Sequence, residues 1–100
     1  MSDCCNTKKE SVQIGELAEI LKIISEPNRL KILCLLKSGT KCVCEVQKML
    51  GLKQNLVSHH LKILMDANLI VFDKDGQWRH YSLNKANLEK HRDIFNKFLT

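Results

Sequence analysis

The sequence has no long apolar run. Its first ten residues, MSDCCNTKKE, contain no hydrophobic segment of the signal-peptide type, and the most apolar stretch, LKILCLLK, is interrupted by Lys31 and Lys37. A helix that crosses a membrane needs about 20 apolar residues. We therefore expect neither a signal peptide nor a membrane span, and predict a cytoplasmic protein with no membrane partner.

The residue sets that carry most enzyme chemistry are also missing. There is no paired carboxylate, no nucleophile beside a base and no glycine-rich phosphate loop, and Ser58-His59-His60 does not make a triad. Repeats, low-complexity tracts and interdomain linkers are absent too, so a chain of 100 residues predicts one domain that is not an enzyme. We expect a flexible arm at residues 1–10, which carries cysteines, and a folded domain at residues 11–100.

The charge balance and the cysteines indicate what such a domain could bind. The 16 Lys and Arg residues outnumber 11 Asp and Glu residues, which gives a net charge of +5 and favours a polyanion as partner. The chain has 5 cysteines, and an odd number in a reducing compartment is typical of free thiols or thiolate ligands rather than of a disulfide framework.

Apolar spacing predicts four helices followed by a hairpin and a last helix. A first helix ends near Pro27, a second carries Cys34 inward and ends at Gly39, and short helices follow at about 42–50 and 54–67. Asp75-Gly76 is a strong hairpin signal between two β-prone runs, and residues 85–99 are again helical. On the second helix, Leu30, Leu33 and Leu36 are expected to face inward with Cys34. The apolar stripes of the other helices are Ile14, Leu17, Leu21 and Ile24, then Val43, Val46 and Leu50, and finally Leu88, Phe95, Phe98 and Leu99.

This order predicts a mainly α fold with a β-hairpin wing, a winged helix-turn-helix, in which the helix at 54–67 has one polar and one apolar face. Val57, Leu61 and Leu64 lie opposite the polar groups. An isolated helix of this kind would be a solvated surface, but the neighbouring hairpin and the net positive charge favour DNA binding. The polar groups are those of Gln54 at the helix start, then Asn55, Ser58, His59 and Lys62, with Lys74 and Arg79 near the hairpin tip.

Three stretches, EPNRLKILCLLKSG, CVCEVQKMLGLKQNLVSHHLKILMDANLI and DGQWRHYSL, resemble the ArsR/SmtB family of metal-responsive winged-helix repressors. The resemblance implies a homodimer, built from the first and last helices, that binds double-stranded operator DNA with inverted-repeat symmetry. Binding of an inducer then releases the homodimer from the DNA. The positions matching the family's DNA-reading residues are Gln54, Asn55, Ser58, His59 and His60, although His60 points nearer the core, and those matching the wing are Lys74, Gln77 and Arg79.

Cys42 and Cys44 supply only two thiols, and a closed metal site needs more ligands than that. Cys4 and Cys5 in the arm are the candidates to complete the site. Thiolates suit soft cations such as Cd, Pb, Zn or trivalent arsenic. Cysteines in the arm together with a CVC box resemble the cadmium and lead sensors, so we expect Cd, Pb or Zn as the inducer. The alternatives are an arsenite- or antimonite-responsive repressor and a thiol-redox regulator on the same fold.

The sequence departs from the family in three places. Cys4 and Cys5 are adjacent rather than spaced apart, and the third cysteine of the arsenic-sensing variant is replaced by Gln47. The family's metal site on the last helix would begin at Lys85 and Asn87, which do not match it. We therefore assign no metal to two other histidines, and expect His80 on the wing surface and His91 at the dimer interface.

On a regular helix, Cys42 and Cys44 would lie about 160° apart, on opposite flanks of the apolar stripe. Two thiols in that arrangement cannot easily hold one ion. The start of this helix must therefore be irregular, or must loosen, for both thiolates to converge. Cys34 lies between leucines and is expected to pack in the core.

Overall fold

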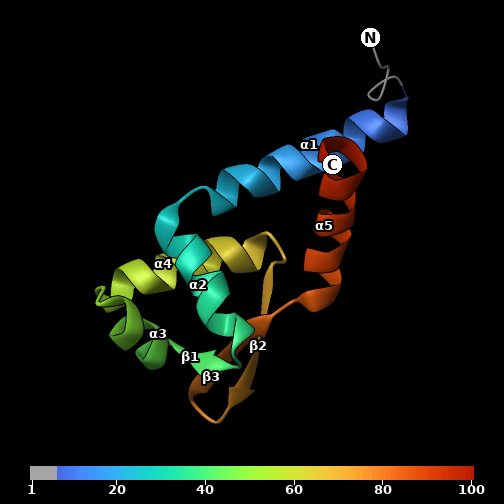
Figure 1. Cartoon of the computed structure of the whole chain (residues 1–100). Coiled ribbons are helices and arrows are strands. Elements are labelled where there is room, and N and C mark those ends of the chain that lie inside the picture. The colour runs from blue at the N-terminus through green and yellow to red at the C-terminus, as the bar shows by residue number, and fades with distance from the viewer. Residues whose placement is uncertain (1–6) are drawn as a thin grey trace.

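The computed structural model describes residues 7–100 and consists of five helices and a small sheet (Figure 1). Helices α1 and α5 extend to one side, and the remaining elements form a compact body. In chain order the elements are α1 (Lys8–Ile24), α2 (Pro27–Lys37), β1 (Lys41–Cys42), α3 (Val43–Leu50), α4 (Gln54–Asp66), β2 (Ile70–Asp75), β3 (Trp78–Leu83) and α5 (Lys85–Leu99). The predicted winged helix-turn-helix is confirmed.

Each helix boundary has a local cause. Thr7 caps α1 by accepting a hydrogen bond from the backbone N–H of Glu10, so the helix begins at Lys8, inside the stretch predicted to be an arm. Pro27 occupies the first turn of α2, where its missing N–H costs no hydrogen bond. Gly51 ends α3 with a φ of 66°, a left-handed conformation that glycine adopts without steric cost.

The sheet has three antiparallel strands in the order β1-β3-β2. Strands β2 and β3 form the predicted hairpin, in which Asp75 pairs with Trp78 across a turn at Gly76, whose φ is 63°. Strand β1 was not predicted. It consists of two residues, with Lys41 opposite Tyr81 and Cys42 opposite His80. This short strand joins the start of α3 to the base of the wing.

The core lies between α2, α3, α4 and the sheet. As predicted, the apolar stripe of α4 is buried, with Val57, Leu61 and Leu64 no more than 1% exposed. The inward assignments on α2 were wrong for two residues: Leu30 is 47% exposed and Cys34 is also exposed, because Ile32 and Leu36 form the buried face of that helix. The full core cluster is Ile20, Ile32, Leu36, Val46, Val57, Leu61, Leu64, Leu69, Ile70 and Tyr81.

Replacing a core leucine by alanine should measure how much this packing contributes to the stability of the fold. We expect Leu64→Ala, at a side chain with 0% exposure, to lower the free energy of unfolding by about 2–5 kcal/mol in urea titrations at fixed protein concentration. Leu30→Ala is the matched control, because that leucine is 47% exposed, and it should cost much less. Equal losses in the two variants would contradict the assignment of the core.

Candidate DNA-binding surface and cysteine site

Helix α4 presents an open polar face. Gln54, Asn55, Ser58, His59 and Lys62 are all exposed, on the side of the helix opposite its buried stripe. The helix begins at Gln54 and receives no side-chain cap from Lys53, although the Leu56 N–H in its first turn donates a 3.0 Å hydrogen bond to Asn55 Oδ1. A helix N-terminus attracts anions, including phosphate.

The wing brings further polar side chains toward α4. Lys74, Gln77 and Arg79 are exposed, and the Arg79 guanidinium lies 4.9 Å from the centre of the Phe72 ring. This cation–π contact holds Arg79 on the face of the sheet that looks toward α4. A cavity of about 490 Å³ lies between the wing and α4. Its lining residues are Val43, Ser58, Lys62, Met65, Asp66, Arg79 and Tyr81.

His60 does not lie on this surface, and its assignment to the DNA-reading set was wrong. It is 6% exposed and faces α2, with its Nδ1 atom 3.7 Å from Glu26 Oε2 and 3.5 Å from an Arg29 guanidinium nitrogen. Burial lowers the pKa of His60, and the positive charge of Arg29 lowers it further, while Glu26 acts in the opposite direction. His60 therefore links α4 to the start of α2.

The two cysteines of the CVC box, Cys42 and Cys44, have different backbone conformations. Cys42 is the extended N-cap residue of α3, with φ −87° and ψ 167°, and Cys44 lies inside the first turn of that helix. The Cys42 backbone N–H donates a 3.1 Å hydrogen bond to Glu45 Oε1. This bond is the main reason that the pKa of Glu45 is lowered. The two cysteines therefore do not share one regular helix, in agreement with the predicted irregular start.

Both thiols border the surface described above. A cavity of about 230 Å³ is lined by residues from the start of α3, the start of α4 and the wing. These residues are Cys42, Val43, Cys44, Gln54, Gln77, Trp78 and Arg79. The structure therefore brings the predicted metal ligands on α3 together with three predicted DNA-contacting residues. Cys4 and Cys5 lie outside the described residues.

The other residues singled out from the sequence lie elsewhere. Cys34 borders an apolar hollow with Pro27 and Leu30 on α2, away from the box. His80 is half-buried on β3, directly across the sheet from Cys42. Sequence periodicity could not reveal this neighbour, because the two-residue strand that makes it is too short to show a pattern.

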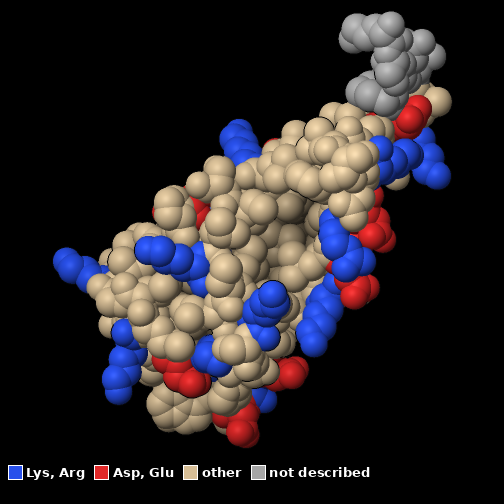
Figure 2. Space-filling view, in the orientation of Figure 1, with Lys and Arg blue, Asp and Glu red and all other residues tan. Residues whose placement is uncertain are grey.

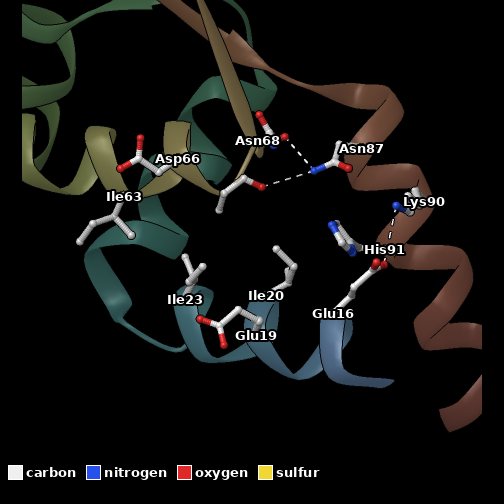
Figure 3. Close-up of a pocket in the computed structure, with 11 residues that line it drawn as sticks. Glu16, Glu19, Ile20, Ile23, Ile63, Asp66, Asn68, Asn87, Lys90 and His91 are labelled. Carbon is white, nitrogen blue, oxygen red and sulfur yellow. Dashed lines mark hydrogen bonds and ion pairs between the residues drawn. The ribbon is translucent and has the colours of Figure 1, made fainter. Parts of the chain in front are cut away.

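His91 lies at a third cavity, of about 610 Å³, between α1, the end of α4 and α5 (Figure 3). The molecule is visibly hollowed between α1 and α5 (Figure 2). Lys90 pairs with Glu16 at 3.7 Å, and Asn87 donates hydrogen bonds to the backbone oxygens of Ala67 and Asn68. Because Glu16, Glu19 and Asp66 all line this cavity, it is unsuited to phosphate.

Comparison with known proteins fits this arrangement. The model for "Bacterial regulatory protein, arsR family" matches residues 26–71. The arsenical resistance operon repressor of Staphylococcus aureus is 43% identical over 74 residues, which cover 74% of this chain and 71% of that protein. The chain belongs to the ArsR family. It is thus a winged-helix transcriptional repressor of a metal(loid)-responsive family, and not an enzyme.

Two further proteins show the range of the similarity. A crystal structure described as a possible transcriptional regulator for arsenical resistance is 31% identical, with a TM-score of 0.72 over 80% of this chain and 83% of that one. A Staphylococcus aureus homolog of the cadmium resistance regulatory protein CadC is 29% identical, over 75% of this chain and 63% of that protein. Within the described part of this ArsR-family chain, no helix has the length and apolarity that membrane crossing requires.

The buried histidines predict a pH dependence of stability for this ArsR-family protein. The pKa values of His60 and His91 are both lowered, chiefly by burial, so the unfolded chain, where histidine titrates near pH 6.5, binds more protons than the folded chain. Stability should therefore be fully present above about pH 6.5 and fall as the pH drops below it.

Thermal unfolding between about pH 7.5 and about pH 5.5 measures this effect. We expect the melting temperature to fall on acidification in the wild-type protein and to fall less in His60→Gln. The control is His59→Gln, at the exposed neighbouring residue, which should keep the wild-type dependence. A melting temperature that rises on acidification would show that the sign is wrong.

Proposed function

We propose that this protein is a homodimeric repressor that binds operator DNA and leaves it when arsenite or antimonite binds Cys42, Cys44 and one thiolate of the arm. The observation that carries the proposal is the 230 Å³ cavity in which the two box cysteines lie beside Gln54, Gln77 and Arg79. An ion held by those thiolates acts directly on residues proposed to contact DNA.

The choice of inducer follows from similarity and ligand chemistry. The sequence placed Cd, Pb or Zn first, but a relative named for arsenical resistance is 43% identical, whereas the cadmium regulator homolog is 29% identical. Three thiolates satisfy a trigonal arsenic site, and Gln47 stands where the arsenic-sensing variant has its third cysteine. We propose that Cys4 or Cys5 supplies the missing thiolate.

The proposed DNA contacts are the exposed polar residues of α4 and the wing. The amide, hydroxyl and imidazole groups of Gln54, Asn55, Ser58 and His59 can hydrogen-bond to base edges in the major groove. Lys62, Lys74, Gln77 and Arg79 would contact phosphates or the neighbouring groove. Figure 2 shows basic side chains mixed with acidic ones rather than gathered in one patch, so binding depends on the placement of these few groups.

The homodimer is proposed from the apolar surface of α1 and α5. These two helices pack against each other and project from the body of the molecule (Figure 1). Between them they expose Val12, Leu21, Phe95 and Leu99, each at least 38% exposed. A second copy that covers this surface would relate two α4 helices by twofold symmetry, and these would reach half-sites about 34 Å apart on DNA.

Release can start at the cap of α3. The Cys42 backbone is held by Glu45, and closing Cys42 and Cys44 around an ion requires the first turn of α3 to change. Helix α3 packs against α4 and against β3, so such a change shifts the recognition helix or the wing. Coupling of this kind is commonly about 1–3 kcal/mol, which corresponds to a 5- to 150-fold loss of DNA affinity.

The DNA contacts can be tested through salt dependence. We expect operator affinity to fall steeply as salt increases, because phosphate contacts release counterions. Arg79→Ala should weaken binding and make the slope of log affinity against log salt shallower by about one. Lys90→Ala on α5 removes an equal charge at the acidic cavity and should keep the wild-type slope. A flat salt response of the wild-type protein would contradict this DNA surface.

The inducer can be tested by mobility shift on the DNA upstream of the protein's own coding sequence, with arsenite, antimonite, Cd, Pb and Zn added in turn. Arsenite and antimonite should release the wild-type protein. Neither Cys42→Ser nor Cys44→Ser should respond, and Cys4→Ser/Cys5→Ser should respond weakly. Cys34→Ser is the matched control, because its exposed thiol lies on α2, and it should respond normally. Release by oxidant but not by arsenite would favour the thiol-redox alternative instead.

A further inference from the structure

Three residues with metal-binding chemistry form a row across the sheet. His80 on the central strand β3 is the register partner of Cys42 on β1 and also of Asp73 on β2. Directly opposed residues of antiparallel strands have side chains on the same face, with Cβ atoms about 4.5–5.5 Å apart. Cys42, His80 and Asp73 are therefore successive neighbours on one face.

This face is the outer one. Tyr81, the residue after His80, is 6% exposed and points into the core, so alternation along β3 directs His80 away from the core. His80 is half-buried, Asp73 is exposed, and Trp78 on the same face of β3 is 53% exposed. The row is thus accessible to an ion from solvent.

We propose that Cys42, Cys44 and His80 form a binding site for a thiophilic divalent cation, Zn²⁺ or Cd²⁺, in which Asp73 orients the imidazole of His80. A histidine that ligates a metal almost always donates its other ring N–H to a carboxylate or carbonyl oxygen, and Asp73 stands on the side of His80 away from Cys42. The order thiolate, imidazole, carboxylate across the three strands matches that requirement.

The proposal rests on the use of Cys42 and Cys44 in the proposed function, and adds a second class of ligand to the same box. Two thiolates and one imidazole suit Zn²⁺ and Cd²⁺, and a fourth position stays open for water. Trivalent arsenic is satisfied by three thiolates and has no use for the imidazole. His80 then decides which ions the box accepts.

The site assembles when the ion binds. In residues 7–100, no three Cys, His, Asp or Glu side chains already surround one point. Cys44 lies on the first turn of α3, Cys42 is the register partner of His80, and the Cys42 N–H donates to the Glu45 carboxylate of the same turn. Rotation of side chains with a loosening of that turn brings the three ligands together.

The test compares Cd²⁺ and arsenite binding to the full-length, reduced protein. We expect Asp73→Asn to lower the Cd²⁺ affinity about 10- to 100-fold, and His80→Ala to lower it further, while neither variant changes the arsenite affinity. In protein labelled with ¹⁵N-histidine, the His80 ring nitrogens should shift on Cd²⁺ saturation and not on arsenite saturation. Asp75→Asn, two residues along the same strand face, and His91→Gln should bind both ions as the wild type does.

Unchanged Cd²⁺ affinity in His80→Ala, or unshifted His80 ring nitrogens at Cd²⁺ saturation, would overturn the proposal. A Cd²⁺ affinity that falls in His80→Ala without a ring shift would assign His80 a structural role and would overturn it too. Failure of the proposed function is a separate result: it would appear as arsenite binding that survives Cys42→Ser and Cys44→Ser.

Discussion

The pairing of β3 on both of its edges holds the functional parts of this protein together. Through β1, the central strand fixes the backbone of Cys42 and hence the start of α3, and through β2 it builds the wing. Its buried Tyr81 anchors the sheet in the core formed with α2, α3 and α4. The position of helix α4 relative to the wing is therefore fixed only while these strand pairings and the packing of the core stay intact.

Much of the fold follows from patterns that repeat along the chain. The 3.6-residue spacing of Val57, Leu61 and Leu64 predicted the buried face of α4, and Asp75-Gly76 predicted the hairpin. Strand β1 could not be predicted, because two residues show no period. Cys34 was misplaced for a related reason: α2 is apolar around much of its circumference, so the pattern predicted Leu36 correctly but did not reveal that Ile32 faces inward in place of Leu30 and Cys34.

The candidate site was predictable in its residue types and not in its geometry. Exposure of Gln54, Asn55, Ser58 and His59 follows from helix periodicity alone. The burial of His60 between Glu26 and Arg29 depends on α2, whose packing against α4 is a tertiary contact. In the same way, the cavity shared by the box cysteines and the wing depends on β1, so sequence reasoning could name the candidate ligands without placing them beside the candidate DNA-binding residues.

The shortness of strand β1 also favours local opening of the chain at this point. Its two residues add few hydrogen bonds to the sheet, and the residue after Cys42 already belongs to α3. Amide groups in such a segment exchange with solvent through local opening, at a free energy well below that of global unfolding. The first cysteine of the CVC box thus lies on the shortest strand and the second on the adjoining first turn of α3, so the proposed ion could reorganise both without unfolding the core.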